Sequence, residues 1–342
     1  MRNSMKALAI TALCLAAAQA QATELLPRYN IDITSTTVSG LSSGAFMTHQ
    51  FHLAESDIIN GVAIIAGGPY YCAEGFVTNA LRKCMQQTGA GSPSAEESLG
   101  EAQKAERKGL LPALANIEND KVYIFTGTMD TTVNPVAAAA TRDLYKELGV
   151  KADNLMYVDT VPAGHANVTL DHGNACASND PPNIVACDRD EAGNILEFLI
   201  GDLNPKATEL TGKIIEFSQK EFSPKPEAIS MADTGYVYVP KACGEGQPCK
   251  LHVALHGCNQ NAAKIDRAYV TDTGYLPWAD SNNIVMLFPQ TIARNDLSLE
   301  GVFNPNACWN WWGYGGDNNY HTRVGYQIAA IRSMVDRLAS GR

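Results

Sequence analysis

The feature that most constrains the fold is the order of two short motifs along the chain. Gly40-Leu41-Ser42-Ser43-Gly44 is a G-x-S-x-G pentapeptide, preceded by the β-branched stretch 31–38 and followed by the helix-compatible stretch 45–56. Strand, tight turn and helix are the setting in which such a pentapeptide exposes its serine hydroxyl. A second strand-like run, 251–255, leads into His256-Gly257-Cys258 about two hundred residues later. In proteins that carry both motifs in one sheet, the motif at 256–258 usually precedes the serine pentapeptide in the sequence. The order in this chain is therefore inverted.

Short apolar runs of the size that parallel strands use follow the pentapeptide. Strands in a parallel sheet are buried on both faces, so they are continuous runs of large or β-branched residues. Helix-compatible segments lie between these runs, and one of them, residues 137–148, is introduced by Pro135 near its first turn. The predicted buried strands are 62–66, 122–125, 155–158 and 284–288.

The C-terminal half predicts a different local arrangement. Residues 235–240 and 250–254 are strand-like runs joined by a loop that contains glycine and cysteine, which indicates an antiparallel hairpin. The end of the chain carries one apolar stripe at spacings of three and four residues, which is typical of a helix packed on a core. The stripe consists of Val324, Ile328, Ile331, Val335 and Leu338.

Together these elements predict an α/β fold of the α/β-hydrolase type, with a mostly parallel central sheet and helices on both faces. In the usual order, the hairpin, the strand at 251–255, the next strand and a helix lead into the strand before the serine. Here that helix ends the chain, and the serine strand lies near the N-terminus. We therefore predict a circular permutation, in which the polar, proline-containing segment 202–233 connects the former termini.

The first 22 residues are typical of a secretory signal peptide. Two basic residues precede an apolar run from Ala7 to Ala18, and small-x-small sites allow cleavage after Ala20 or Ala22. About twelve apolar residues are too few to span a bilayer. We expect an exported protein, extracellular or periplasmic, in which residues 23–342 form a single domain.

The charge of the chain argues against two classes of partner. The formal net charge is -10, and loss of Arg2 and Lys6 with the signal peptide takes it to -12. An acidic protein is not expected to bind nucleic acid or an anionic membrane surface.

The sequence also has neither a phosphate-binding loop of the G-x-x-x-x-G-K-[ST] type nor a dinucleotide-binding glycine motif at a helix start, so we expect no cofactor. A monomer is the expected oligomeric state.

The eight cysteines that follow the signal peptide predict disulfides. An even number of cysteines in an exported protein favours disulfide bonds, and no C-x-x-C pair supports a metal site. Three pairs are separated by only six to twelve residues, and the last two cysteines pair by elimination. The predicted bonds are Cys72–Cys84, Cys176–Cys187, Cys243–Cys249 and Cys258–Cys308.

A serine hydroxyl is a weak nucleophile unless a base takes its proton, so Ser42 requires a histidine partner. His165 fits because it lies on a loop that follows the strand-like run 155–161. An aspartate that orients this histidine is expected after the preceding strand, and Asp130 fits that place. The alternatives are a structural loop histidine and a turn-forming aspartate.

Acyl transfer also needs backbone N–H groups that bind the developing oxyanion. The N–H of Ser43, the residue after the serine, is one candidate, and a residue of the turn 256–258 should supply the other. A Cys258–Cys308 bond would hold that turn and bring nearby aromatic side chains to the site. The aromatic side chains are Trp309, Trp311 and Trp312. They either bind an apolar or polymeric substrate or pack in the core.

These motifs together resemble the extracellular poly(3-hydroxybutyrate) depolymerases whose catalytic domain is circularly permuted. The resemblance implies a secreted serine esterase that cleaves poly(3-hydroxybutyrate), related polyhydroxyalkanoates or their oligomers through an acyl-enzyme. It implies Ser42, Asp130 and His165 as the catalytic triad, and the N–H groups of Ser43 and Cys258 as the oxyanion hole. The matching stretches cover nearly the whole mature chain and are 38–47, 62–72, 164–166, 231–240, 251–260 and 308–311.

The resemblance also places an aromatic side chain of segment 308–312 at the substrate groove. Many relatives carry a separate polymer-binding domain behind a linker, which we do not expect in this chain. One enzymatic alternative is a secreted feruloyl- or acetyl-type carboxylesterase that acts on plant cell-wall esters. An alternative of another class is a non-catalytic protein that binds polymer.

Overall fold

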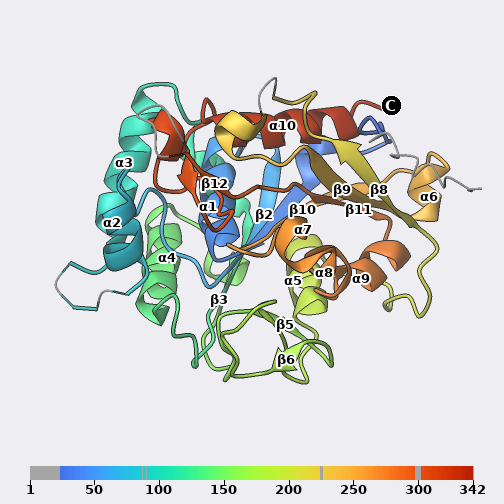
Figure 1. The fold of residues 1–342 in the computed structure, drawn as a ribbon, viewed down its shortest axis with the longest axis horizontal. Coiled ribbons are helices and arrows are strands. Elements are labelled where there is room, and N and C mark those ends of the chain that lie inside the picture. Colours follow the sequence, from blue (N-terminus) through green and yellow to red (C-terminus); the bar gives the residue numbers. More distant parts are fainter. Residues whose placement is uncertain (1–23, 87, 90, 224–225, 297–301, 342) are drawn as a thin grey trace, which may run out of the picture.

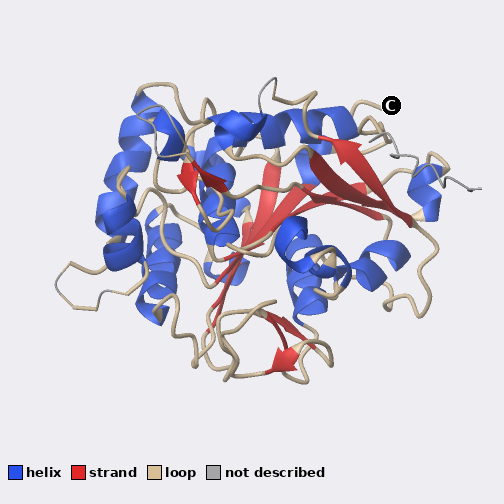
Figure 2. Ribbon diagram, in the orientation of Figure 1, coloured by secondary structure: helices blue, strands red, loops and turns tan. Residues whose placement is uncertain are grey.

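The computed structural model has a central sheet with helices on both faces (Figures 1 and 2). The signal peptide expected over residues 1–22 lies outside the described residues. Among the described residues, no helix combines the length and the apolar character needed to cross a bilayer. The structure describes residues 24–86, 88–89, 91–223, 226–296 and 302–341.

Eight strands form the sheet, and β1 lies near its middle. The six strands from β4 to β11 in the spatial order run parallel, and β9 and β8 extend this sheet in antiparallel fashion. The spatial order is β4 (Leu155–Val158), β3 (Lys121–Phe125), β2 (Ile59–Ile65), β1 (Thr36–Leu41), β10 (Lys250–Leu255), β11 (Ile284–Phe288), β9 (Thr234–Val239) and β8 (Lys213–Ser218).

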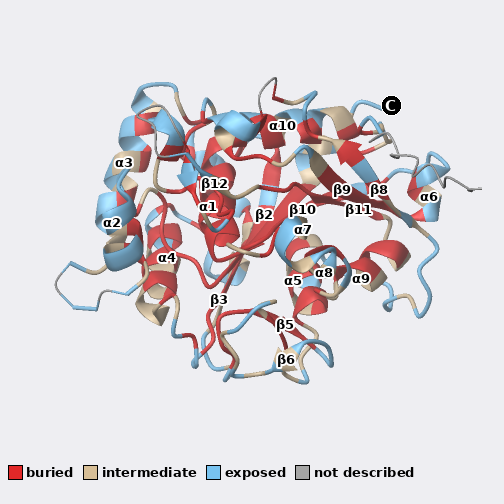
Figure 3. Ribbon diagram, viewed as in Figure 1, coloured by how far each residue is buried: buried red, intermediate tan, exposed pale blue. Residues whose placement is uncertain are grey.

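The central strands are buried along their length (Figure 3) because helices cover both faces of the sheet. Successive side chains of a strand point to opposite faces, and β3 shows this alternation: Val122 and Ile124 join one hydrophobic core, whereas Tyr123 and Phe125 join the other. The continuous apolar runs in the sequence are therefore explained by two cores, one on each side of the sheet.

The first core lies under four long helices and the second under two. α1 packs directly on β1, β2 and β10, and all twelve of its residues are buried. The helices over the first core are α1 (Ser43–Ala54), α3 (Ala95–Arg107), α4 (Pro135–Glu147) and α10 (Tyr326–Leu338), and those over the second are α5 (Glu191–Ile200) and α9 (Tyr275–Ser281).

Short elements complete the fold around the sheet. β5, β7 and β6 form a small parallel sheet, and β12 pairs with β13. These and the remaining short elements are α2 (Val77–Asn79), the π-helical turn η2 (Ala80–Cys84), β5 (Asn167–Thr169), β6 (Asn174–Ala175), β7 (Ile184–Ala186), α6 (Lys241–Gly244), α7 (Ala262–Ile265), α8 (Ala268–Thr271), β12 (Arg294–Asn295) and β13 (Phe303–Asn304), with 3-10 turns at 33–35, 114–119, 152–154, 226–229 and 314–316.

The predicted hairpin is wrong. β9 and β10 do not pair, because β11 lies between them and pairs antiparallel with β9 and parallel with β10. β9 instead pairs with β8, an edge strand in the segment interpreted as a connection. A turn-forming loop marks a change of direction but does not decide which strands pair, and the wholly buried run of β11 occupies the inner position.

Two element boundaries also differ from the prediction. β1 begins at Thr36, since residues 33–35 form a 3-10 turn that Asp32 caps by accepting a hydrogen bond from the Thr34 N–H. The last helix begins at Tyr326, so Val324 precedes it and is exposed. The other members of the predicted stripe lie in α10 and are buried against the first core.

Four disulfide bonds join the predicted pairs of cysteines. Cys72–Cys84 ties the segment of α2 and η2 to the loop after β2, and Cys176–Cys187 closes the chain around β6 and β7. Cys243–Cys249 closes the loop between β9 and β10. Cys258–Cys308 joins the loop after β10 to a segment fifty residues later.

A buried histidine lies between the strands β1 and β10. The Nδ1 atom of His252 is 2.8 Å from Thr37 Oγ1, and its Nε2 atom is 2.8 Å from Ser39 Oγ. The Tyr275 hydroxyl donates to Ser39 Oγ at 3.0 Å. Because His252 is fully buried, loss of hydration lowers its pKa from 6.5 to about 3, so the ring is neutral in the folded protein above about pH 3.

The buried neutral state of His252 predicts acid sensitivity. As pH falls below 6.5 the unfolded chain gains a proton at this histidine while the folded protein does not, so the free energy of unfolding declines down to about pH 3. In His252→Gln, whose amide can still bond to Thr37 and Ser39, the decline between pH 6 and 4 should be smaller by about 1.4 kcal/mol per pH unit. Urea unfolding at several pH values measures this difference; an unchanged slope would contradict it.

Candidate active site

Ser42 lies on a strained turn between β1 and α1. Its φ of 57° is in the left-handed region, which a non-glycine residue rarely adopts. A Cβ atom on Gly40 would lie 2.2 Å from the Gly44 carbonyl oxygen, and one on Gly44 would lie 2.1 Å from the Leu255 carbonyl oxygen. Both flanking glycines are therefore required by close backbone contacts, the second of them with the end of β10.

His165 and Asp130 are directly hydrogen-bonded. His165 Nδ1 lies 2.8 Å from Asp130 Oδ2, and both side chains are almost fully buried. The other carboxylate oxygen, Oδ1, accepts the N–H groups of Thr132 at 2.8 Å and Val133 at 2.9 Å. These bonds fix the carboxylate, which in turn fixes the orientation of the imidazole ring.

The parallel sheet brings these groups to one edge. Ser42 directly follows β1, Asp130 is in the loop after β3, and His165 is in the loop after β4. Carboxyl ends of parallel strands share one edge of a sheet, where α/β proteins commonly bind their ligands. Ser42 and His165 line the same cavity without a hydrogen bond to each other among the described residues. Such contacts are often long until a substrate is bound.

Two asparagines hold the loops of His165 and Asp130, and sequence reasoning did not find them. Asn179 Oδ1 accepts the N–H of His165 at 2.9 Å, and its Nδ2 donates to the Met129 carbonyl at 3.0 Å. Asn183 Nδ2 donates to the His165 carbonyl at 2.8 Å. The one sequence signal for them was the polar, proline-containing run between Cys176 and Cys187, which is typical of a structured loop.

The turn after β10 lies against the serine. A Cβ atom on Gly257 would be 3.3 Å from Ser42 Cβ, so the turn and the serine are in direct contact. The Gly257 carbonyl accepts a hydrogen bond from His256 Nδ1 at 2.7 Å, which fixes the peptide plane between Gly257 and Cys258. The N–H of a trans peptide points away from its carbonyl. The N–H of Cys258 has no acceptor among the described residues.

The N–H of Ser43 also has no acceptor among the described residues. Ser43 is the first residue of α1, where the N–H groups have no intrahelical acceptor and the helix dipole favours negative charge. Ser43 and Cys258 follow two strands that pair side by side, β1 and β10. Two such donors beside a serine can bind the oxyanion of a tetrahedral intermediate.

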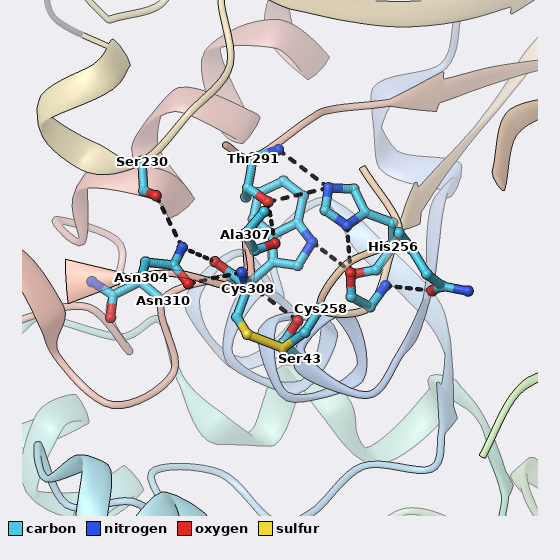
Figure 4. The surroundings of a disulfide bond; sticks show 12 residues. Ser43, Ser230, His256, Cys258, Thr291, Asn304, Ala307, Cys308 and Asn310 are labelled. Carbon is cyan, nitrogen blue, oxygen red and sulfur yellow. Dashed lines mark hydrogen bonds between the residues drawn. A yellow bond between two sulfur atoms is a disulfide. The ribbon is translucent and has the colours of Figure 1, made fainter. Parts of the chain in front are cut away.

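The Cys258–Cys308 bond connects this turn to the aromatic segment (Figure 4). The Trp309 side chain is fully buried, and its Nε1 donates to the His256 carbonyl at 2.9 Å. The expectation that Trp309 contacts substrate is therefore wrong: this residue does not line the cavity and supports the turn from the core. Spacing along the chain did not separate the three tryptophans; only Trp311 and Trp312 line the cavity.

Trp311 and Trp312 do line the cavity. The Trp311 ring stacks on Phe46 with centroids 3.9 Å apart, and Trp312 meets Trp311 edge to face. The cavity has a volume of about 440 Å³. Ser42, His165 and Cys258 line it, and its lining is largely apolar, with Val77, Leu81, Met85 and Phe303 contributing side chains.

A larger hollow of about 550 Å³ lies between η2 and α3, away from these residues. Charged side chains dominate it, and Lys83 there bonds to Glu74 and Glu97, each at 2.5 Å. Ser42 and His165 do not line this hollow, so the larger volume does not identify the candidate site. Within the described part of the chain, no cluster of histidine, cysteine, aspartate and glutamate has the geometry to hold a metal ion.

A serine on a strand-to-helix turn, an aspartate-bonded histidine in the same cavity and unoccupied N–H donors define the serine hydrolase class of site. No protein-family model matches the chain. It is 38% identical over 341 residues to a polyhydroxybutyrate depolymerase of Talaromyces funiculosus, with 96% of each chain covered. The chain belongs to the poly(3-hydroxybutyrate) (PHB) depolymerase family.

Other relatives agree with this assignment. The chain is 45% identical over 321 residues to a poly(3-hydroxybutyrate) depolymerase of Delftia acidovorans, and the match covers 92% of this chain and 62% of that protein. The crystal structure of PHB depolymerase from Penicillium funiculosum matches with a TM-score of 0.84 and 36% identity, over 93% of this chain and 99% of that chain. A serine-to-alanine variant of a PHB depolymerase complexed with an R3HB trimer matches with the same values.

The close contact at Gly44 predicts that a side chain at this position disrupts the turn of Ser42. In Gly44→Ala the new methyl group meets the Leu255 carbonyl, so the turn must shift. We expect labelling of Ser42 by a fluorophosphonate to slow by more than about tenfold, together with a loss of about 3 kcal/mol or more of stability. The control is Gly100→Ala in α3, where the added methyl meets no atom within 4 Å; it should add about 0.5–1 kcal/mol. Equal rates of Ser42 labelling in both variants would contradict the predicted effect of this contact.

Proposed function

We propose that the protein is a secreted serine esterase that hydrolyses poly(3-hydroxybutyrate), related polyhydroxyalkanoates or their oligomers to hydroxy acids. The observation that carries this proposal is the cavity itself: Ser42 at its strained turn and the aspartate-bonded His165 share an apolar-walled pocket, in a chain of the PHB depolymerase family. A neutral polyester fits such walls, because its methyl-bearing backbone is apolar between the ester groups.

The proposed mechanism is acyl transfer in two steps. His165 takes the proton of Ser42, whose Oγ attacks the ester carbonyl, and the N–H groups of Ser43 and Cys258 bind the oxyanion. His165 then returns the proton to the departing alcohol end of the polymer. Water, deprotonated by the same histidine, attacks the acyl-enzyme; the hydroxy acid leaves and His165 returns the proton to Ser42 Oγ. Asp130 stabilises the imidazolium in both steps.

The relatives support the choice of substrate. The relatives from Delftia and Talaromyces are named for depolymerisation of this polyester, and the serine-to-alanine variant holds an R3HB trimer. In this chain Trp311 and Trp312 are the aromatic side chains that would contact such an oligomer. The four disulfides support an oxidising destination outside the cytoplasm.

We further propose that the fold is a circularly permuted α/β-hydrolase and that residues 23–342 form one domain. Moving the segment from β8 to α10 in front of β1 would give the hydrolase strand order, with an antiparallel pair of strands at one edge followed by parallel strands. The sheet order supports this proposal, since β8 and β9 lie at that edge and β10 pairs with β1. One sheet built from both halves of the chain supports a single domain.

The decisive experiment compares wild-type protein with Ser42→Ala on emulsified poly(3-hydroxybutyrate), p-nitrophenyl butyrate and methyl ferulate. We expect release of 3-hydroxybutyrate by the wild type and a loss of more than about a thousandfold in the variant, because no other group replaces the nucleophile. The matched control is Ser39→Ala, which removes the hydroxyl of a fully buried serine on β1, the strand that Ser42 follows. It should keep polymer hydrolysis while losing stability.

Other outcomes of this comparison would favour the alternatives. Hydrolysis of methyl ferulate alone would support a cell-wall esterase. Polymer binding without any ester hydrolysis would support a non-catalytic binder. Equal activity of wild type and Ser42→Ala would remove Ser42 from the mechanism.

Exposed apolar side chains at the rim of the cavity predict adsorption to solid polymer. Leu81 and Phe303 line the cavity, and each is more than half exposed. The double variant Leu81→Ser/Phe303→Ser should bind a polyester film about tenfold more weakly, because two apolar contacts are lost, and should retain hydrolysis of p-nitrophenyl butyrate. Leu210→Ser, which changes an exposed leucine next to β8, is the control. Equal film binding of all three proteins would contradict this prediction.

A further inference from the structure

One side chain holds two loops that supply different parts of the proposed site. Gln260 is almost fully buried. Its Oε1 accepts the N–H of Gly257 at 2.7 Å, and its Nε2 donates to the carbonyls of Pro182 at 2.8 Å and Asn183 at 3.2 Å. The first partner belongs to the turn after β10, whereas the other two lie in the loop between β6 and β7, where the Asn183 side chain binds the His165 carbonyl. A single amide therefore ties the two together.

The connection continues to the histidine and the aspartate. Asn183, whose carbonyl Gln260 binds, donates through its side chain to the carbonyls of His165 and Asn179. Asn179 accepts the N–H groups of His165 and of Thr131, which is the residue after Asp130. The side chains of Gln260, Asn183 and Asn179 thus connect the turn after β10 to the backbone of His165 and to the residue after Asp130.

Gln260 also decides which N–H of the turn is left for substrate. The Gly257 N–H is occupied by the Gln260 side chain, and the Gly257 carbonyl accepts the backbone N–H of Gln260 at 3.2 Å. The peptide plane that bears the Cys258 N–H is held through that carbonyl. A rotation of the turn would redirect this N–H, and misplacement of one oxyanion donor slows acyl transfer strongly.

We propose that Gln260 is a positioning residue that couples the oxyanion turn to the loop of His165. It maintains the positions of the Cys258 N–H and the His165 imidazole relative to Ser42. Both groups can then bind the same tetrahedral intermediate. This inference rests on the proposed serine esterase mechanism, because only that mechanism requires the two loops to act on the same atoms.

Two variants separate the contacts of Gln260. Gln260→Leu removes all of its side-chain hydrogen bonds at similar volume, and Gln260→Glu keeps an acceptor for Gly257 but cannot, as a carboxylate, donate to Pro182 and Asn183. We expect kcat on p-nitrophenyl butyrate to fall by about tenfold to a hundredfold in both, with KM changed by less than about threefold. The inhibition constant of phenylboronic acid, which forms a tetrahedral adduct with the serine, should rise by a similar factor.

The chain offers a matched control in Gln219. This glutamine is equally buried, accepts the N–H of Gln290 at 3.0 Å and donates to the carbonyls of Ala232 at 2.7 Å and Gln290 at 2.9 Å. Gln219→Leu and Gln219→Glu should lower the melting temperature as much as the Gln260 variants do, yet keep kcat within about threefold of the wild type.

The outcomes distinguish this inference from the proposed function. If the Gln260 variants lose no more kcat or boronate affinity than the Gln219 variants at equal stability, Gln260 is only structural and the inference is overturned. If the loss is confined to KM, the coupling of the two loops is likewise excluded. Wild-type protein that hydrolyses no ester would overturn the proposed function, and the inference with it. Should Gln260→Leu fail to fold, Gln260→Glu alone decides.

Discussion

The structure depends above all on the parallel pairing of β1 with β10. Residues more than two hundred positions apart lie side by side, with Thr37 beside His252 and Gly40 beside Leu255. This register puts Ser42 next to the turn at Gly257, where a Cβ atom would already crowd the serine. The buried His252 reinforces the pairing, since its two ring nitrogens bond to side chains of β1. One strand pair thus brings Ser42 and the turn 256–258 together.

Much of the sheet could be predicted because its signals are local. Buried parallel strands are continuous apolar runs, and β2, β3 and β11 coincide closely with such runs. The hairpin failed because strand pairing is not local: β9 and β10 follow one another in sequence, but β11 takes the place between them. Edge strand β8 was missed because only alternate side chains of it are buried, so its sequence contains charged residues.

The site shows the same limit at the level of side chains. Asp130 and His165 could be found since each follows a strand on a loop, and the structure bonds them to each other. Trp309 carries the same residue type and the same local setting as its two neighbours, and only packing places it in the core. Asn179, Asn183 and Gln260 bind backbone groups that are distant in sequence. No pattern along the chain records such partners.

The position of β1 between β2 and β10 has a consequence for biosynthesis. A chain made from its N-terminus completes Ser42, Asp130 and His165 long before residues 250–258 leave the ribosome. Until then, one side of β1 has no partner and the turn that would hold the Cys258 N-H has not been made. Pairings of such large sequence separation form slowly, because a long loop must close first. Assembly of the site is therefore delayed until nearly the whole chain has been synthesised.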